Sequence, residues 1–133
     1  MQFLLDTHTF LWFISGDERL PSAARDLIAD IENEIFLSVA SLWEIAIKVS
    51  LKKLKLGAPF AELFPGQLIK NEINVLPIDF EALNLVANLP FHHRDPFDRL
   101  MIAQCLTQNM PIISRDSQFT AYQVNQIWQN PSD

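Results

Sequence analysis

Residues 2–14 of the chain read QFLLDTHTFLWFI, in which a short apolar run ends at Asp6 and a second apolar segment begins at once. A continuous apolar run of this length predicts a strand that is buried on both faces, as in a parallel sheet. Residues 7–14 continue as an expected helix, which the turn-forming residues at 15–17 end. A buried strand that passes directly into a helix is typical of α/β proteins.

The alternation of strand and helix continues along the chain. Further strands are predicted at residues 34–38, 73–76 and 111–114, with a weak fifth near 126–128. Helices are predicted between them at residues 21–31, 40–51, 60–71, 79–88 and 95–108. This order predicts an α/β three-layer sandwich around a central, mostly parallel sheet of four to five strands. No repeat or linker divides the sequence, so a single domain is expected over residues 1–133.

The composition is that of an ordinary globular protein, with 49% hydrophobic and 20% charged residues. The net charge of −6 disfavours general binding of polyanions, so any activity on nucleic acid has to rely on a metal ion or a small basic patch. The lone Cys105 lies in an apolar stretch and is expected to be a buried thiol. The sequence shows neither a secretory signal nor an apolar segment long enough to span a membrane, which predicts a cytoplasmic protein with no membrane partner.

Four acidic side chains are expected at one edge of the sheet. Asp6 directly follows the first strand, and Asp116 comes two residues after the fourth. Glu44 and Asp98 lie in the first turns of two of the predicted helices. Because functional groups of α/β proteins gather beyond the carboxyl ends of the strands, these carboxylates from four distant segments are predicted to converge on one cleft.

Each acid also has a local structural explanation. Asp95 is the natural cap of its helix, with a peripheral place in the site as the alternative, and Asp98 then lies in the first turn, where the helix dipole alone favours a carboxylate. Glu44 is placed to pair with a lysine one turn later, and Asp116 could be a turn residue. Asp6 is the hardest to explain in this way, because a carboxylate between two apolar segments needs a partner.

Convergence of these carboxylates favours a metal site. Several carboxylates close together repel one another unless they are protonated or bridged by cations. Mg²⁺ and Mn²⁺ are suitable counter-charges because they prefer oxygen ligands. Such an ion could polarise a phosphodiester and activate a water molecule.

The segments that carry the acids resemble four motifs of PIN domains, in particular of the VapC toxins of bacterial type II toxin–antitoxin pairs. The four segments are LLDTH at 4–8, SVASLWEIAIK at 38–48, RDPFDRLMIAQ at 94–104 and ISRDSQF at 113–119. They occur in the order found in the family and cover nearly the whole chain.

The resemblance implies a PIN-like fold and a single-strand-type RNA endonuclease. Asp6, Glu44, Asp98 and Asp116 match the family's catalytic acids, which hold one or two Mg²⁺ or Mn²⁺ ions. Supporting roles are expected for Thr7 and for Ser114, which stands where the family often has threonine and could orient Asp6 or a water on the metal.

The resemblance also implies protein partners, namely a cognate antitoxin and a second copy of the chain in a homodimer. One feature of the residues themselves agrees with this. The helix at 40–51 carries a second apolar stripe, made by Trp43, Ile47 and Leu51, in addition to the stripe that the core requires. A thicker core is the alternative explanation for this stripe.

Three basic residues lie beside the acidic motifs and are expected to contact the phosphates of the RNA substrate: Lys48, Arg99 and Arg115. Lys48 begins a lysine cluster at 48–55, for which a solvated helix surface is the alternative explanation. The histidines at 92–93 lack the spacing of a zinc site and are expected to be loop residues or minor RNA contacts.

Other functions remain open. A phosphohydrolase with Asp6 as its nucleophile would need a second acid two residues later, where this chain has His8. A phosphate-receiver domain would also need paired acids beside the first strand. A non-catalytic α/β protein-binding module would explain the acids as caps and ion pairs.

Overall fold

The computed structural model describes residues 1–128 and contains one five-stranded sheet in the order β3-β2-β1-β4-β5, with every neighbouring pair parallel. The strands are β1 (Gln2–Leu5), β2 (Glu34–Ser38), β3 (Ile73–Leu76), β4 (Ile112–Ile113) and β5 (Gln126–Ile127). The prediction of an α/β sandwich around a mostly parallel sheet is confirmed.

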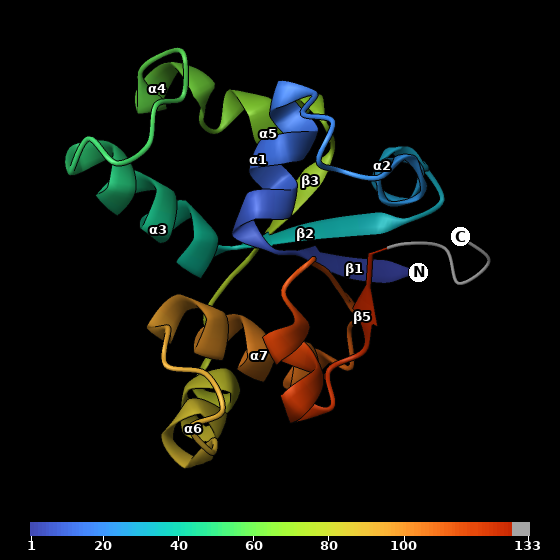
Figure 1. Cartoon of the computed structure of the whole chain (residues 1–133), viewed down its shortest axis with the longest axis vertical. Coiled ribbons are helices and arrows are strands. Elements are labelled where there is room, and N and C mark those ends of the chain that lie inside the picture. Colours follow the sequence, from blue (N-terminus) through green and yellow to red (C-terminus); the bar gives the residue numbers. More distant parts are fainter. Residues whose placement is uncertain (129–133) are drawn as a thin grey trace.

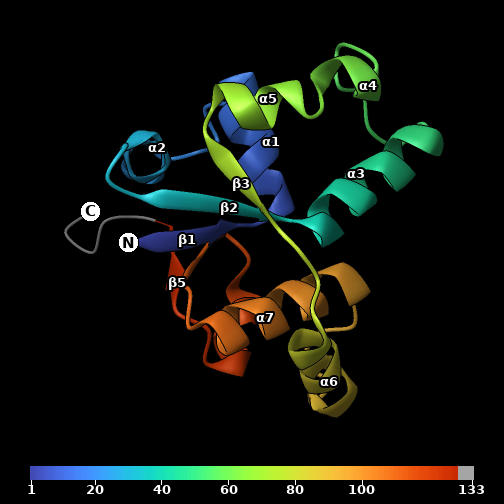
Figure 2. The ribbon, with the colours of Figure 1, turned by 180° about the vertical axis from the view of Figure 1, so that it is seen from behind.

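Helices cover both faces of the sheet (Figures 1 and 2). The helices are α1 (Thr7–Ser15), α2 (Ser22–Ala29), α3 (Val39–Ser50), α4 (Phe60–Leu63), α5 (Gly66–Lys70), α6 (Phe80–Asn88), α7 (Pro96–Gln108) and the 3₁₀ helix η1 (Ser117–Tyr122). The elements α1 to α5 lie on one side of the sheet, and α6, α7 and η1 lie on the other. Among residues 1–128, no helix is long and apolar enough to cross a membrane.

The central strand β1 is buried on both faces, as its apolar sequence predicts. Phe3 and Leu5 pack with Phe10 of α1 in one core, whereas Leu4 packs with Ile102 of α7 in the other. Successive side chains of a strand point to opposite faces, so this short run contributes to both cores. The strands β2, β3 and β4 likewise contribute side chains to both cores.

The order of the strands reverses direction at β1. The chain proceeds from β1 outward to β2 and β3, and then returns to place β4 on the opposite side of β1. Helices therefore leave the carboxyl ends of β1 and β4 toward different sides of the sheet (Figure 1). A crevice forms at such a reversal, and it is the usual location of a functional site in an open parallel sheet.

The helix predicted at 60–71 is wrong, because the structure divides this segment into α4 and α5. Phe64 between them is extended, with φ −122° and ψ 134°, and Pro65 follows it. The ring of a proline clashes with a helical conformation of the residue before it, which explains the break. Phe64 turns inward and packs on Phe10 and Phe60, at ring-centroid distances of 6.0 and 4.7 Å.

Arg99 of α7 is buried and terminates the neighbouring helix α6. Its guanidinium donates hydrogen bonds to the carbonyls of Val86, Leu89 and Pro90, at 3.0 to 3.2 Å. The last carbonyls of a helix have no partner within the helix, and no glycine follows α6 to provide a C-terminal cap. The forked guanidinium supplies these missing donors, while its face lies 4.1 Å from the ring centre of Phe91.

We expect Arg99→Lys to lower the free energy of unfolding by about 1–3 kcal/mol, because an ammonium group lacks the fork and leaves buried carbonyls without donors. Urea denaturation measures this change. Arg94→Lys is the matched control, since Arg94 is exposed in the adjacent loop, and it should stay within about 0.5 kcal/mol of the wild type. Equal stabilities of the two variants would contradict the structural role of Arg99.

Candidate metal centre

The four predicted acids line one cavity of about 240 Å³ at the carboxyl edge of the sheet. Asp6 follows β1, Glu44 lies on α3, Asp98 lies in the first turn of α7 and Asp116 begins η1 after β4. The remaining lining residues are Thr7, His8, Trp12, Lys48, Asp95 and Arg115. The structure thus brings together side chains that lie up to 110 residues apart in the sequence.

Ser114 ties Asp6 to the loop that carries Asp116. The hydroxyl of Ser114, which is fully buried, donates to Oδ2 of Asp6 at 2.8 Å and accepts the backbone N–H of Asp116 at 3.0 Å. Asp6 occupies the N-cap position of α1 but makes no side-chain cap there. Its carboxylate is directed to Ser114 and the cavity instead, which agrees with the supporting position expected for Ser114.

The loop after β4 is held by Gln126 from β5. The amide of Gln126 donates to the carbonyls of Ser114 and Asp116, at 2.7 and 2.8 Å. Asp116 accepts the backbone N–H of Gln118 with Oδ1 at 2.9 Å, which caps η1. One carboxylate oxygen of Asp116 therefore stabilises the loop, and Oδ2 lies toward His93. Asp116 combines the turn role and the site position that the sequence left as alternatives.

Glu44 is held at both of its carboxylate oxygens. Thr7 donates from Oγ1 to Oε1 at 2.8 Å, and Nζ of Lys48 lies 2.9 Å from Oε2. The Lys48 ammonium is thus engaged with Glu44, as helical spacing allows, in addition to lining the cavity. Thr7 also contacts the buried hydroxyl of Ser41 at 2.8 Å, so this side of the site is a connected polar network.

Asp95 and Asp98 lie together at the start of α7. Oδ1 of Asp95 accepts the backbone N–H groups of Phe97 and Asp98 at 2.9 and 3.0 Å, which is the expected helix cap. The side chain of Asp98 is directed into the cavity, where Asp95 is also part of the lining. Capping and site position are therefore compatible for Asp95.

Burial and mutual repulsion perturb these carboxylates. Burial raises the pKa of Asp98 to about 8, and the charges of Asp6, Asp95, Glu44 and Asp116 add to the shift. The pKa of Asp6 is also raised by burial, although the hydrogen bond from Ser114 opposes the shift. Asp6 and Asp98 therefore ionise less readily than an exposed aspartate. A nearby cation would stabilise their charged forms.

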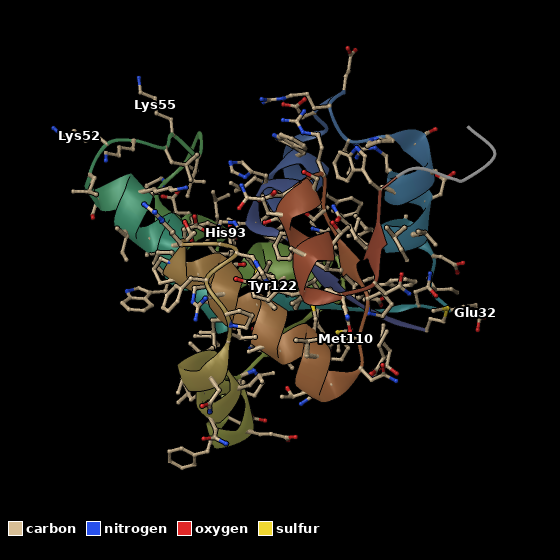
Figure 3. The ribbon with its side chains drawn as sticks, turned by 60° about the horizontal axis from the view of Figure 1, so that its bottom comes forward. Glu32, Lys52, Lys55, His93, Met110 and Tyr122 are labelled. Carbon is tan, nitrogen blue, oxygen red and sulfur yellow. The ribbon has the colours of Figure 1, made fainter. Side chains whose placement is uncertain are left out.

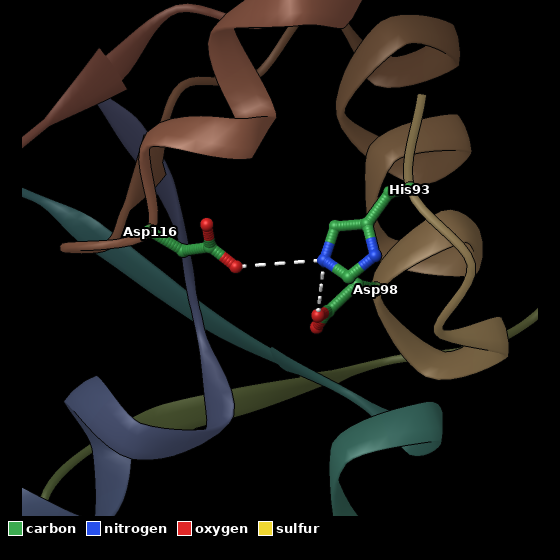
Figure 4. Close-up of side chains that lie close together, drawn as sticks. All are labelled: His93, Asp98 and Asp116. Carbon is green, nitrogen blue, oxygen red and sulfur yellow. Dashed lines mark ion pairs between the residues drawn. The ribbon is translucent and has the colours of Figure 1, made fainter. Parts of the chain in front are cut away.

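Sequence reasoning missed one residue of the site, His93. Its Nε2 lies 2.9 Å from Oδ2 of Asp98 and 3.4 Å from Oδ2 of Asp116 (Figure 4). These three atoms are close enough to one another to surround a single metal ion. The sequence shows only a histidine two residues before the helix cap Asp95. Its position at the cavity depends on the path of the loop, which the sequence does not reveal.

The three basic residues expected near the substrate have different locations. Arg115 is exposed, lines the cavity and stacks 4.9 Å from the ring centre of Trp12. Lys48 lines the cavity and pairs with Glu44. Arg99 is a correction: it is buried beneath the loop after α6 and does not line the cavity. Lys52 and Lys55 extend outward from the segment after α3 (Figure 3).

The donor set fits a hard divalent cation. The cavity presents carboxylates from four elements, and oxygen ligands of this charge are those that Mg²⁺ and Mn²⁺ prefer. The raised pKa values of Asp6 and Asp98 indicate that the protein alone does not compensate the charge that these residues would carry together. A bound cation would supply that compensation.

Comparison with solved structures shows a shared fold at low sequence identity. VapBC2 from Rickettsia felis, solved bound to a DNA fragment from its promoter, has a chain that is 16% identical, with a TM-score of 0.73 over 97% of this chain and all of that chain. FitAcB from Neisseria gonorrhoeae contains a chain that is 21% identical, with a TM-score of 0.61 over 98% of both chains.

Comparison with characterised sequences gives a closer but partial match. Ribonuclease VapC16 from Mycobacterium tuberculosis is 38% identical over 55 residues, which amount to 41% of this chain and 39% of VapC16. This match therefore spans less than half of that relative. The sequence profile of the PIN domain, in contrast, matches residues 3–125, and the chain accordingly belongs to the PIN domain family.

Proposed function

We propose that this protein is a metal-dependent endoribonuclease that acts as the toxin of a toxin–antitoxin pair in the cytoplasm. The observation that carries the proposal is the convergence of four carboxylates on one cavity, in which the pKa of Asp98 is raised to about 8. Membership of the PIN domain family and the partial match to a VapC ribonuclease support RNA as the substrate.

In this proposal Asp6, Asp98, Asp116 and Glu44 hold one or two Mg²⁺ or Mn²⁺ ions. When bound, the metal supplies a Lewis acid for the phosphodiester and lowers the pKa of a coordinated water. Ser114 keeps Asp6 oriented, and Thr7 and Lys48 do the same for Glu44. These contacts hold the acids before substrate arrives, so that binding requires little rearrangement.

Arg115 and Lys48 are the proposed contacts to the RNA backbone. Both line the same cavity as the acids, which would bring their positive charges beside the phosphate to be cleaved. The contribution has to be local, because the chain as a whole carries a net charge of −6. Arg115 is the stronger candidate, since Lys48 already pairs with Glu44.

A protein partner is proposed to cover exposed apolar side chains near the site. In the second apolar stripe, Trp43 of α3 and Leu51, the residue that follows α3, are exposed by 60% and 57%. Trp43 makes an edge contact with Phe97 of α7, with ring centres 5.3 Å apart. A surface of this kind favours a partner, here a second copy of the chain or the antitoxin.

The central test is cleavage of a panel of single-stranded RNAs in Mg²⁺ or Mn²⁺. We expect Asp6→Asn and Asp98→Asn each to lower the cleavage rate by more than about 100-fold, beyond the roughly 10–100-fold typical of groups that only orient metal ligands. The control is Asp26→Asn, an exposed aspartate of α2, which should cleave like the wild type.

Cleavage that survives both substitutions and a chelator would refute a metal-dependent nuclease. Hydrolysis of a phosphate ester through a covalent adduct on Asp6, with no RNA cleavage, would favour a phosphohydrolase instead. Absence of both activities together with tight binding of a protein would favour the binding module.

Arg115→Met should weaken RNA binding without changing the metal site. Removal of one phosphate contact on single-stranded nucleic acid is expected to reduce the slope of log K against log salt by about 0.7. Fluorescence anisotropy of a labelled RNA in Ca²⁺ over a series of salt concentrations measures this slope. Arg25→Met is the control, because Arg25 lies on α2 with its guanidinium near Phe13 and outside the cavity lining. Equal slopes in the two variants would contradict a phosphate contact.

The stability of the metal-free protein should fall as the pH rises from about 5 to 8. An aspartate in the unfolded chain has a pKa of about 3.9, so in this window native Asp98, with a pKa near 8, holds a proton that the unfolded chain has lost. Asp98→Asn cannot ionise, and at pH 8 we expect its Tm to exceed that of the wild type by several degrees, equivalent to about 1 kcal/mol or more.

Thermal melts at a series of pH values, with a chelator present, provide the measurement. Asp26→Asn, the control, should keep the slope of the wild type. The same dependence of Tm on pH in wild type and Asp98→Asn would contradict a buried, repelled Asp98. Saturating Mg²⁺ should remove part of the slope in the wild type, because a ligand that binds the ionised native state stabilises it.

A further inference from the structure

A second cavity, of about 350 Å³, adjoins the cavity of the acids. His8 and Trp12 of α1 line both cavities and form their shared wall. The other walls come from α1 itself, the turn after it, the segment that joins α3 to α4, and α4 and α5, all on one side of the sheet (Figure 1). A strand of RNA held at the acids therefore has this second cavity directly beside it.

The floor of the second cavity is apolar and belongs to the protein core. Its side chains are half-buried and pack against the core on that face of the sheet, and they are Leu11, Ile14, Leu54, Leu56 and Leu63. Because core packing holds these side chains, the cavity is formed before a ligand arrives, and binding requires little further ordering. Apolar and aromatic surfaces of this kind receive the bases of single-stranded nucleic acids.

The rim of the second cavity is polar and carries an excess of positive charge. Its members are Ser15, Asp17, Arg19, Lys55 and Gln67. Asp17 is the one carboxylate among them, and Arg19 binds it through Nε and Nη2 at 2.7 to 3.2 Å. Lys55 is exposed and makes no ion pair within residues 1–128. The rim thus has the charge that suits phosphate groups, in a chain whose net charge is −6.

The shared wall at Trp12 is flanked by one arginine from each cavity. Cζ of Arg19, which lines the second cavity, lies 4.8 Å from the centre of the Trp12 ring. Cζ of Arg115, which lines the cavity of the acids, lies 4.9 Å from it. The two guanidinium groups are therefore at most about 10 Å apart, and cation–π contacts hold both beside the buried indole. Phosphates one or two nucleotides apart in a single strand can meet both cations.

We propose that the second cavity binds a nucleobase of the RNA, from a nucleotide next to the phosphodiester that is cleaved. The inference rests on the proposed function, because it places the substrate across both cavities. Arg115 and Arg19 contact phosphates of this part of the strand, while the apolar floor receives the unstacked base. Bases within a double helix are stacked and paired, so such a site selects unpaired nucleotides. The position beside the acids and the two cations at the shared wall favour RNA over a protein segment as the occupant.

Removal of single bases from an RNA that the wild type cleaves tests the proposal. Each position in turn is made abasic, and binding is measured by fluorescence anisotropy in Ca²⁺. In the wild type we expect one position beside the cleaved bond to lose roughly 5- to 150-fold in affinity, which corresponds to the loss of one stacked base. This series needs no protein variant, so its result does not depend on how a substitution affects folding.

Ser15→Phe should fill the cavity from its rim and remove the same contact from the protein side. The affinity for intact RNA should fall by a similar factor, and the abasic position should then cause no further loss, because the two changes remove one shared contact. Ser50→Phe is the matched control. Both serines are exposed last residues of helices whose hydroxyls donate to the carbonyl three residues earlier, but Ser50 does not line the cavity. Ser50→Phe should bind like the wild type and keep the full abasic effect.

The outcomes separate this inference from the proposed function. Mn²⁺ affinity without RNA should be the same in Ser15→Phe and the wild type, because the acids lie in the other cavity. Additive effects of Ser15→Phe and the abasic position, or intact RNA bound equally by Ser15→Phe and the wild type, would overturn the inference and leave the cavity to a protein segment. A wild type that cleaves RNA but has no sensitive base beside the cut would also refute the inference alone. A wild type that neither binds nor cleaves RNA would refute the proposed function as well.

Discussion

Repulsion among carboxylates in a poorly solvated cavity is the constraint on which the site depends. Three of the four acids are paired with a group that opposes this repulsion or fixes their geometry: Ser114 for Asp6, Thr7 and Lys48 for Glu44, and a backbone amide for Asp116. The raised pKa of Asp98 shows that part of the desolvation and repulsion is left uncompensated. Burial of a charged group without a partner destabilises the folded state. Carboxylates with strongly perturbed pKa values are therefore typical of functional sites.

The topology of the sheet determines where the four carboxylates meet. β1 lies at the centre, buried on both faces, and the chain leaves it in opposite directions toward β2 and, later, β4. The crevice at that reversal receives Asp6 from β1 and Asp116 from the loop after β4, while α3 and α7 bring the other two acids from opposite faces. The two hydrophobic cores on either face of the sheet hold together four segments that are distant in the sequence.

The strands and most helices could be predicted because apolar periodicity, caps and breakers are local signals. Asp79 and Asp95 cap their helices as the sequence indicates, and the strand at 34–38 has the predicted bounds. The break at Pro65 was missed although its cause is equally local. Arg99 and His93 could not be assigned from the sequence. The partners of Arg99 are carbonyls of the loop after α6, and the position of His93 depends on how the same loop is anchored to Tyr122. Such contacts are tertiary and have no periodic signature.

The hydrogen bonds from Gln126 have a consequence for the stage of synthesis at which the cavity is completed. The loop that presents Asp116 is secured by the edge strand β5, whereas three of the four acids lie in earlier segments. Synthesis proceeds from the N-terminus, so a growing chain on the ribosome contains Asp6, Glu44 and Asp98 before it contains the residue that completes the cavity. The cavity that the four carboxylates line is therefore held in its final form only after β5 has been made and has docked.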